Sequence, residues 1–355
     1  MRWFRYALTG LIAVAAVLVV PGAAQAVPTA EGYVWAHQPD VASYVVNTGY
    51  EFNSTGGQVQ IVREGVGAYR VRFAGMAVSG GVAHATAYGS TNSDFCTVQS
   101  WVQSAPDLLL RVRCFDEAGA AADTRFVANF TNRQSAADTF LYLWSNQAAP
   151  AMPYEPSTTY SFDSAGGPIT VERLGVGRYR IQATSVTDTY PADFLNGHFD
   201  ATAYGTSPVR CEVLEPQPTD PPTLPVSCYD IGGAWVDSRF TLTFSQGRSL
   251  LGTNASHASA VVHPNPAAPP DVLGWSNDGG APTAVELAEG WYRVTFPGLG
   301  VLNGHVSVGM FGSPPAYCTV GAWWSSGGAE VVSVGCFDAA THDPTAAFFT
   351  VGFVD

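Results

Sequence analysis

The chain alternates between apolar and polar residues over short stretches that are separated by glycine-containing turns. Across 58–61 valine and isoleucine alternate with glutamine, and across 69–73 tyrosine, valine and phenylalanine alternate with arginine. A Gly-Val-Gly turn at 65–67 lies between the two stretches. A period of two with β-branched and aromatic residues on one side is typical of half-buried antiparallel strands. The pattern therefore predicts a β-hairpin with one face turned toward a core.

The same hairpin pattern returns twice along the chain. It recurs at 169–181 around a second Gly-Val-Gly turn, and at 285–296, where Val285 and Leu287 are expected on the buried side. A motif Ala-Thr-Ala-Tyr-Gly, found at 85–89, is also repeated. We expect it to form a core strand beside the strand at 108–113 that leads to the second cysteine of its unit.

These recurrences divide the chain into similar units, and no stretch after the N-terminal segment shows extended helical periodicity. The predicted units span 30–134, 135–247 and 248–355. Short strands separated by regularly spaced turns predict an all-β fold, in which each unit is an antiparallel β-sandwich, Ig-like or jelly-roll-like. A closed barrel is the less favoured alternative. Because the links are short and polar, the units are expected to sit end to end.

Cysteines fall one pair to a unit at nearly the same spacing. In an exported chain this layout predicts one disulfide inside each repeat. The predicted pairs are Cys96 with Cys114, Cys211 with Cys228, and Cys318 with Cys336. A thiolate metal site is the alternative, but the Cys-x-x-Cys pairs typical of such sites are absent. We therefore predict disulfides and no metal or cofactor.

The first 26 residues read as a secretory signal peptide. Arg2 and Arg5 precede an apolar run from Ala7 to Val20, and Ala-Gln-Ala at 24–26 resembles a cleavage site. The apolar run is shorter than a bilayer-spanning helix requires, and no comparable run follows. The sequence therefore predicts a secreted, extracellular protein with no membrane span once the signal is removed.

Composition narrows the possible partners. The chain is 46% hydrophobic and 13% charged, which is typical of a folded protein, and its formal net charge is −13. An acidic chain is a poor partner for nucleic acid or anionic membranes. All basic side chains except the histidines are arginines, which excludes a phosphate-binding loop of the Gly-Lys-Ser type and a lysine Schiff base.

Tryptophans provide the clearest candidate binding residues. Trp101 and Trp323 each lie five positions after the first cysteine of their unit, and Trp324 follows directly. Aromatic rings on a β-sandwich can stack on sugar rings or anchor a protein partner. Packing against a disulfide in the core is the competing reading, and it is the favoured one. Because neighbouring strand residues point to opposite faces, Trp323 and Trp324 cannot both point inward.

Catalytic candidates are weaker. The nucleophile motif Gly-x-Ser-x-Gly and the zinc motif His-Glu-x-x-His are absent, and no cysteine is left unpaired, so no catalytic residues are predicted. His198 and His305 share a column of the repeat, with His84 two positions along, and we expect solvent-facing histidines near a turn. Recurrent aspartates, among them Asp123 and Asp237, could contribute to a calcium site, but a role in turns or arginine pairs is favoured.

The three recurrent features together resemble a known type of protein. The Gly-Val-Gly-x-Tyr-Arg hairpin, the Ala-Thr-Ala-Tyr-Gly strand and a Cys-Phe/Tyr-Asp hairpin ending in Asp-Ser/Thr-Arg-Phe are similar to repeated domains of uncharacterised secreted proteins of actinobacteria. The third unit departs most, because Glu289-Gly290-Trp291 replaces the glycine turn. The resemblance implies secretion and repetition, and it implies no activity or functional residue.

Two classes of function follow from the sequence. The favoured one is a secreted, non-catalytic protein that binds an extracellular glycan or protein, or that belongs to the cell envelope. Repeated weak binding faces on one chain would gain avidity. The alternative is a secreted hydrolase whose site forms between repeats or in the loops of the second repeat, with His198 or Asp237 taking part.

Overall fold

The computed structural model describes residues 29–47, 49–89, 93–136, 139–189, 197–215, 221–247, 251, 256–312 and 315–355. The predicted signal segment, 1–26, lies outside these residues. In the described part the chain is all-β with one short helix, α1 (Thr184–Thr189). None of its helices is long and apolar enough to span a bilayer.

The strands form three lobes that follow one another along the chain. The first lobe, 29–136, contains β1 (Glu31–Ala36), β2 (Ser43–Val45), β3 (Glu51–Asn53), β4 (Val59–Gly65), β5 (Ala68–Phe73), β6 (Val82–Tyr88), β7 (Phe95–Ser104), β8 (Asp107–Phe115) and β9 (Arg125–Thr131). The second, 139–247, contains β10 (Thr139–Ser145), β11 (Ser161–Asp163), β12 (Thr170–Gly175), β13 (Arg178–Gln182), β14 (His198–Tyr204), β15 (Arg210–Val213), β16 (Leu224–Tyr229) and β17 (Arg239–Gln246). The third, 251–355, contains β18 (His257–His263), β19 (Asp271–Ser276), β20 (Thr283–Ala288), β21 (Trp291–Pro297), β22 (His305–Met310), β23 (Ala316–Ser326), β24 (Ala329–Asp338) and β25 (Phe349–Val354).

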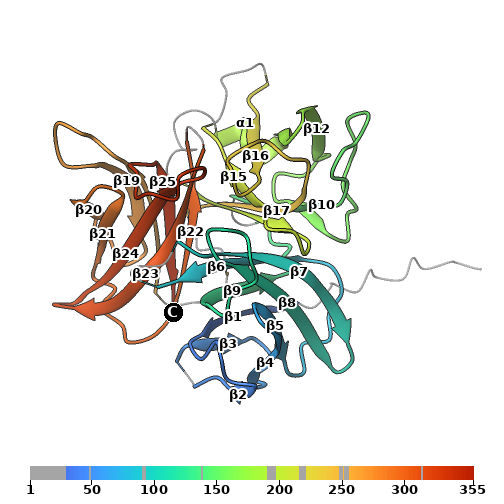
Figure 1. Cartoon of the computed structure of the whole chain (residues 1–355), viewed down its shortest axis with the longest axis horizontal. Coiled ribbons are helices and arrows are strands. Elements are labelled where there is room, and N and C mark those ends of the chain that lie inside the picture. Colours follow the sequence, from blue (N-terminus) through green and yellow to red (C-terminus); the bar gives the residue numbers. More distant parts are fainter. Residues whose placement is uncertain are drawn as a thin grey trace, which may run out of the picture.

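Each lobe has an inner and an outer sheet, and the strand order is the same in all lobes except that the first lobe adds β2 to its outer sheet. The inner sheets run β6-β9-β1-β3, β14-β17-β10-β11 and β22-β25-β18-β19, and the outer sheets run β7-β8-β5-β4-β2, β15-β16-β13-β12 and β23-β24-β21-β20. Parallel bridges between lobes join β23 to β6 in one eight-stranded sheet and β14 to β7 in one nine-stranded sheet. Buried apolar side chains of both sheets make one core in each lobe. The opposite faces of the inner sheets meet at the centre of the molecule, where Figure 1 shows the three lobes converging.

The predicted hairpins are present, and the alternation of side chains explains their burial in two lobes. In the first lobe Ile61 and Val71 face each other across β4 and β5, and both are buried. In the third lobe the register differs from the prediction, because Ala284 is the inward residue of β20. Val285 and Leu287 instead point to solvent, with exposed fractions of 47% and 57%.

All three predicted disulfides are present, and no cysteine is free in the described part. Each bond joins neighbouring outer strands, because its two cysteines are direct partners in the register of β7 with β8, β15 with β16 and β23 with β24. One expectation is wrong. β6 is not the cross-linked neighbour of β8, because it lies in the inner sheet and pairs with β9.

The lobes close into a ring through equivalent backbone contacts. The glycine that ends the Ala-Thr-Ala-Tyr-Gly motif, or its counterpart, donates its N–H to a valine carbonyl of another lobe. The three bonds are Gly89 to Val320 at 2.9 Å, Gly205 to Val98 at 2.9 Å and Gly312 to Val213 at 3.4 Å. These glycines have φ values of 154°, 146° and 140°, a region that favours residues without a Cβ.

This closure contradicts the expected end-to-end arrangement. β6 makes a parallel bridge to β23, β14 makes one to β7, and Phe311 beyond β22 makes one to Val213. Every lobe therefore contacts both others. The short polar links did not indicate this, because a link constrains the distance between lobes and not the angle between them.

Candidate functional site

The predicted binding residue Trp101 lies inside a seam between two lobes. Its exposed fraction is 6%, and its Nε1 donates to the carbonyl of Gly80 at 2.9 Å. The ring packs against aromatic side chains of the second lobe, with centroid distances of 5.8 Å to Trp144, 5.9 Å to Tyr160 and 5.6 Å to Tyr204. Trp101 therefore holds two lobes together, and a ligand cannot reach its ring while the seam is closed.

Trp323 occupies the same position in the seam between the third and first lobes. Its Nε1 donates to the carbonyl of Asn303 at 3.0 Å. Its ring contacts Trp35 at 5.5 Å, Tyr88 at 5.2 Å and Tyr50 at 6.4 Å between centroids. The two aromatic seams are built alike from side chains of different lobes.

Trp324 is the one member of the predicted set with an exposed ring, at 43%. It lies on β23 and is paired with Val331 of β24. Its neighbour Trp323 turns into the seam, so the two rings take opposite faces of the strand as expected.

The three histidines His84, His198 and His305 are buried at the centre of the molecule, although the sequence predicted that they face solvent. His84, His198 and His305 begin or lie within β6, β14 and β22, whose outward faces meet where the lobes converge. All three contact residues of another lobe: His84 Nδ1 lies 3.1 Å from Thr202 Oγ1, His198 Nε2 lies 2.8 Å from Ser307 Oγ, and His305 Nε2 lies 3.2 Å from Asn129 Nδ2. A turn precedes each of these strands, but the contacts between lobes that close the ring bury the histidines.

Burial keeps these imidazoles neutral. Desolvation lowers the pKa of His84 to about 3, of His198 to about 4 and of His305 to about 3. The His84 Nδ1 lies 3.5 Å from Asp200 Oδ1, and burial raises the pKa of that carboxyl to about 8. Because both shifts oppose charge, this contact is a neutral pair rather than an ion pair.

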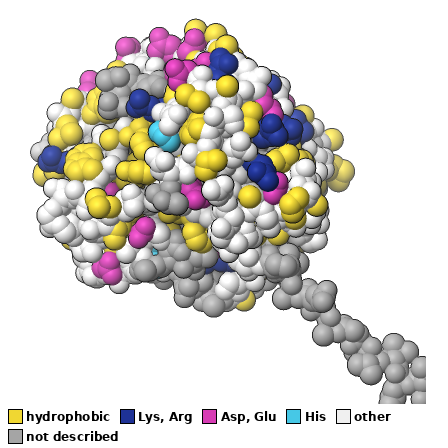
Figure 2. Space-filling model, turned by 90° about the horizontal axis from the view of Figure 1, so that it is seen from below, with side chains coloured by type: hydrophobic (Ala, Val, Ile, Leu, Met, Phe, Trp, Pro, Cys, Tyr) yellow, Lys and Arg dark blue, Asp and Glu magenta, His cyan; other side chains and the backbone are white. Residues whose placement is uncertain are grey.

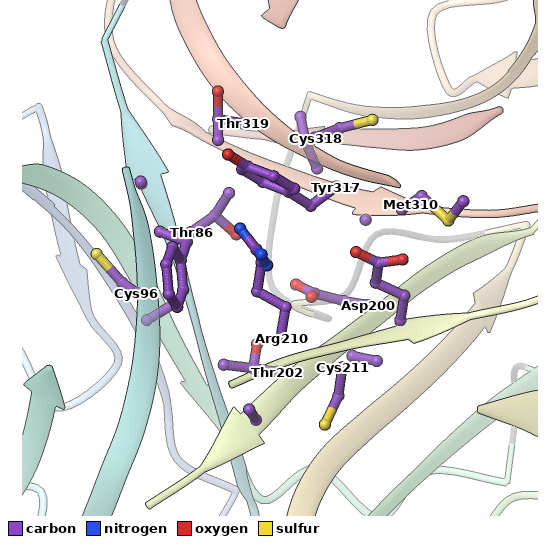
Figure 3. A pocket seen from close by; sticks show the side chains of 18 of the residues that line it. Thr86, Cys96, Asp200, Thr202, Arg210, Cys211, Met310, Tyr317, Cys318 and Thr319 are labelled. Atoms are coloured by element: carbon purple, nitrogen blue, oxygen red, sulfur yellow. The ribbon is translucent and has the colours of Figure 1, made fainter. Parts of the chain in front are cut away.

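A cavity of about 60 Å³ lies along the axis between the lobes, and we call it the axial cavity. Figure 3 shows its walls, which come from strands of all three lobes. Its lining includes one cysteine of each disulfide, Cys96, Cys211 and Cys318, together with Thr86, Thr202, Thr319, Asp200, Arg210 and Glu212. A single water needs roughly 10–15 Å³ of such volume, so the axial cavity has room for several.

Glu212 is the least satisfied group of the axial cavity. It is buried, and neither carboxylate oxygen has a hydrogen-bond partner in the described part of the chain. Asp200 Oδ2 and Thr319 Oγ1 also have no hydrogen-bond partner in the described part of the chain. Burial raises the pKa of Glu212 to about 8, although the nearby Arg210 opposes the shift. A buried carboxyl without partners costs free energy when it ionises.

Arg210 closes one end of the axis. Its guanidinium lies between the rings of Phe95 at 4.7 Å and Tyr317 at 4.2 Å, and Figure 3 shows it reaching toward Tyr317. One Nη donates to the carbonyl of Ala339 at 2.8 Å. Phe95, Arg210 and Tyr317 each precede the first cysteine of their lobe, so a cation replaces the aromatic side chain in the second lobe.

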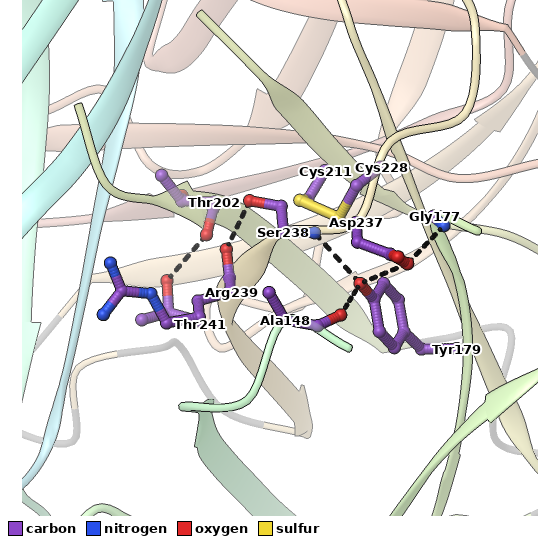
Figure 4. The surroundings of a disulfide bond; sticks show 10 residues. All are labelled: Ala148, Gly177, Tyr179, Thr202, Cys211, Cys228, Asp237, Ser238, Arg239 and Thr241. Carbon is purple, nitrogen blue, oxygen red and sulfur yellow. Dashed lines mark hydrogen bonds between the residues drawn. A yellow bond between two sulfur atoms is a disulfide. The ribbon is translucent and has the colours of Figure 1, made fainter. Parts of the chain in front are cut away.

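The recurrent aspartates have the structural role that was favoured over a calcium site. Asp237 accepts from Arg173 Nε at 2.8 Å, from the Gly177 N–H at 2.9 Å and from the Tyr179 hydroxyl at 3.4 Å, as Figure 4 shows in part. Asp123 makes the same contacts with Arg63, Gly67 and Tyr69 in the first lobe. The arginine lowers the pKa of each aspartate.

No group of three or more histidine, cysteine, aspartate or glutamate side chains could hold a metal ion among the residues that the structure describes. The Ser307–His198 contact resembles a nucleophile and base, but the neighbouring cavity measures about 10 Å³, which is room for no more than one water. The central polar groups can therefore form hydrogen bonds inside the molecule. A substrate cannot reach them in this state.

Sequence reasoning missed Asp200, Arg210 and Glu212. A signal was present, because Arg210 and Glu212 flank the first cysteine of their unit at positions that hold Phe95 and Thr97 in the first. Charged residues in a column that is otherwise aromatic or small indicate a specialised environment.

The chain was compared with protein-family models, with curated proteins and with solved structures, and none of the three comparisons finds a match.

Proposed function

We propose that the chain is a secreted, non-catalytic binding protein made of three copies of one β-sandwich module, Ig-like or jelly-roll-like, related to the uncharacterised secreted repeat proteins of actinobacteria. The common strand order of the lobes supports a shared module. Three disulfides are compatible with an extracellular location. Together with the ring closure, they make a rigid scaffold, which lowers the entropy that binding costs.

The exposed ring of Trp324 is the observation that carries the binding function. It belongs to the outer face of the third lobe, where the register places Trp324, Val331 and Thr295 in one row across β23, β24 and β21. Val285 and Leu287 lie exposed on the same sheet. We call this surface the outer face. A tryptophan on a flat, rigid sheet can stack on a sugar ring or anchor a protein partner.

Other features support binding over hydrolysis. The two residues suggested for a hydrolase are both engaged: His198 is buried at the axis, and Asp237 is paired with Arg173. The side of the molecule in Figure 2 carries acidic and basic side chains interspersed with small apolar groups, without a continuous basic stripe. Since the chain also carries a formal net charge of −13, nucleic acid is a poor candidate for the partner.

Replacing Trp324 with alanine is expected to weaken binding to the natural partner about tenfold or more, because interface tryptophans commonly dominate binding energy. The measurement is retention of the purified chain by isolated cell-wall polymer and by solubilised envelope proteins of the producing organism. Val102→Ala is the matched control, since Val102 holds the corresponding position in the first lobe and is also 43% exposed. Equal retention of both variants would count against the outer face.

A further inference from the structure

β20 is an open edge of the outer face. It ends the eight-stranded sheet and pairs with β21, and no other strand of the described chain lies beside it. The register makes Ala284 equivalent to Ile61 of β4 and Val171 of β12. Each lies two residues before the strand partner of a buried tyrosine, which is Tyr292, Tyr69 or Tyr179 in the respective lobe.

The corresponding edge is covered in both other lobes. In the first lobe β2 lies along β4, with Tyr44 opposite Ile61. In the second lobe Tyr154 takes the same place opposite Val171, and the two residues exchange backbone hydrogen bonds of 3.0 and 2.9 Å. Both tyrosines pack against the core of their lobe. This edge of the module thus accepts an extended segment with a tyrosine at its centre.

The third lobe does not supply such a segment from its own chain. The covering residues come from 37–50 in the first lobe and from 146–160 in the second, which link the first two strands of each inner sheet. The equivalent link in the third lobe is 264–270, with the sequence Pro-Asn-Pro-Ala-Ala-Pro-Pro. Proline lacks the N–H that a ladder needs, so this short link cannot form the missing strand.

The side chains of β20 do not protect its edge. Natural edge strands are commonly guarded by lysine, proline or a covering loop, whereas β20 exposes Val285 and Leu287. By analogy with Val171, Ala284 turns its N–H and C=O away from β21 and toward the open side. Val285 and Leu287 are therefore presented to solvent, whereas Ala284, at 7% exposure, keeps its side chain against the core.

We propose that β20 accepts an extended strand of a partner protein by β-augmentation, with an aromatic side chain of that strand opposite Ala284 in the place that Tyr44 and Tyr154 fill in the other lobes. The proposal goes beyond the outer-face function, because it adds a second site on the same lobe whose partner is a peptide segment. A second copy of the chain is the less suitable occupant. Pairing of β20 with itself would gather Glu286 and Glu289 of two acidic chains at one interface.

The test uses the chain's own covering strand as the probe. A peptide with the sequence of residues 41–47 is titrated into the full chain by calorimetry, and hydrogen exchange of 283–288 is followed by mass spectrometry. We expect binding with a Kd below about 1 mM and slowed exchange in β20. The same peptide with Tyr44→Ala, or with that tyrosine N-methylated, is expected to bind at least about tenfold more weakly.

Protein variants separate this proposal from the outer-face function. Ala284→Pro removes the outward N–H at an edge where proline is tolerated, and it should abolish peptide binding. Trp324→Ala should leave peptide binding unchanged, because Trp324 lies on β23, which β24 and β21 separate from β20. If only retention by envelope material is lost in Trp324→Ala, the outer face stands and the two sites are distinct.

Several results would overturn the proposal. One is the absence of peptide binding by the unaltered chain, and another is protection at β4 in place of β20, which would mean that the peptide displaces β2. Equal affinity of the N-methylated peptide would exclude a backbone ladder. Concentration-dependent dimerisation that Ala284→Pro abolishes would assign the edge to a second copy of the chain.

Discussion

Replacing Trp101 with alanine is expected to lower the free energy of unfolding by about 3 to 5 kcal/mol, the usual cost of truncating a buried tryptophan. The ring is buried between two lobes and contacts three aromatic side chains of the second lobe. The variant also leaves the carbonyl of Gly80 without the indole donor. Both effects weaken the seam, so the loss should appear in chemical denaturation of the full chain.

The neighbouring Val102→Ala provides the control, because that side chain points to solvent on the same strand and its loss should change stability by about 0.5 kcal/mol or less. Trp323→Ala should resemble Trp101→Ala, since Trp323 holds the equivalent seam. A loss below about 1 kcal/mol for Trp101→Ala would mean that the aromatic seam does not hold the lobes together.

Replacing Glu212 with glutamine is expected to stabilise the chain at alkaline pH by on the order of 5 kcal/mol, with little effect near pH 4. The folded pKa of Glu212 is raised from 4.5 to about 8. The folded state therefore holds this proton more tightly than the unfolded state between these values. Stability is full below the unfolded pKa and is lost as pH rises toward 8, by about 1.4 kcal/mol per pH unit for one such group.

Glutamine keeps the size of the side chain and cannot ionise, so the variant should escape this loss. Denaturant midpoints measured from pH 4 to pH 9 would show the native and variant curves separating above pH 5 and running parallel above pH 8. Glu289→Gln, at an exposed position, should superimpose on the native curve. Parallel curves for Glu212→Gln throughout would show that the Glu212 carboxyl is not buried in the axial cavity.

The three buried histidines lower the stability of the folded chain at acidic pH. Their folded pKa values lie below 6.5, so the unfolded state binds protons more readily and stability falls as pH drops below that value. Between pH 4.5 and 6.5 the histidine and carboxyl effects have opposite slopes and partly cancel, so stability is greatest in this range. The polar axis therefore limits the pH range over which the ring is stable.

The sequence predicted local features well because they depend on neighbours in the chain. Alternation at 58–61 and 69–73 corresponds to β4 and β5, and the even distribution of cysteines gave the correct disulfides. Prediction was wrong for β20 because alternation alone does not set which side faces the core. Ala284 is inward since the register with β21 places it opposite Val294.

Features that depend on contacts between lobes were beyond sequence reasoning. Trp101 and Trp323 were expected either in the core of their own unit or as surface anchors, but their ring partners belong to other lobes. His198 follows a turn, yet ring closure places Ser307 of the third lobe against it. Trp324 differs because strand geometry alone predicted that one of the adjacent rings of Trp323 and Trp324 is exposed.

Small-angle X-ray scattering of the monomer most directly tests the closed ring on which the seams, the buried axis and the open edge all depend. A compact chain of residues 27–355 is expected to have a radius of gyration of about 20 Å. Three lobes of about 13 Å each, placed end to end, would give a value of about 30 Å. The account predicts the compact value, and a value near the extended one would contradict it.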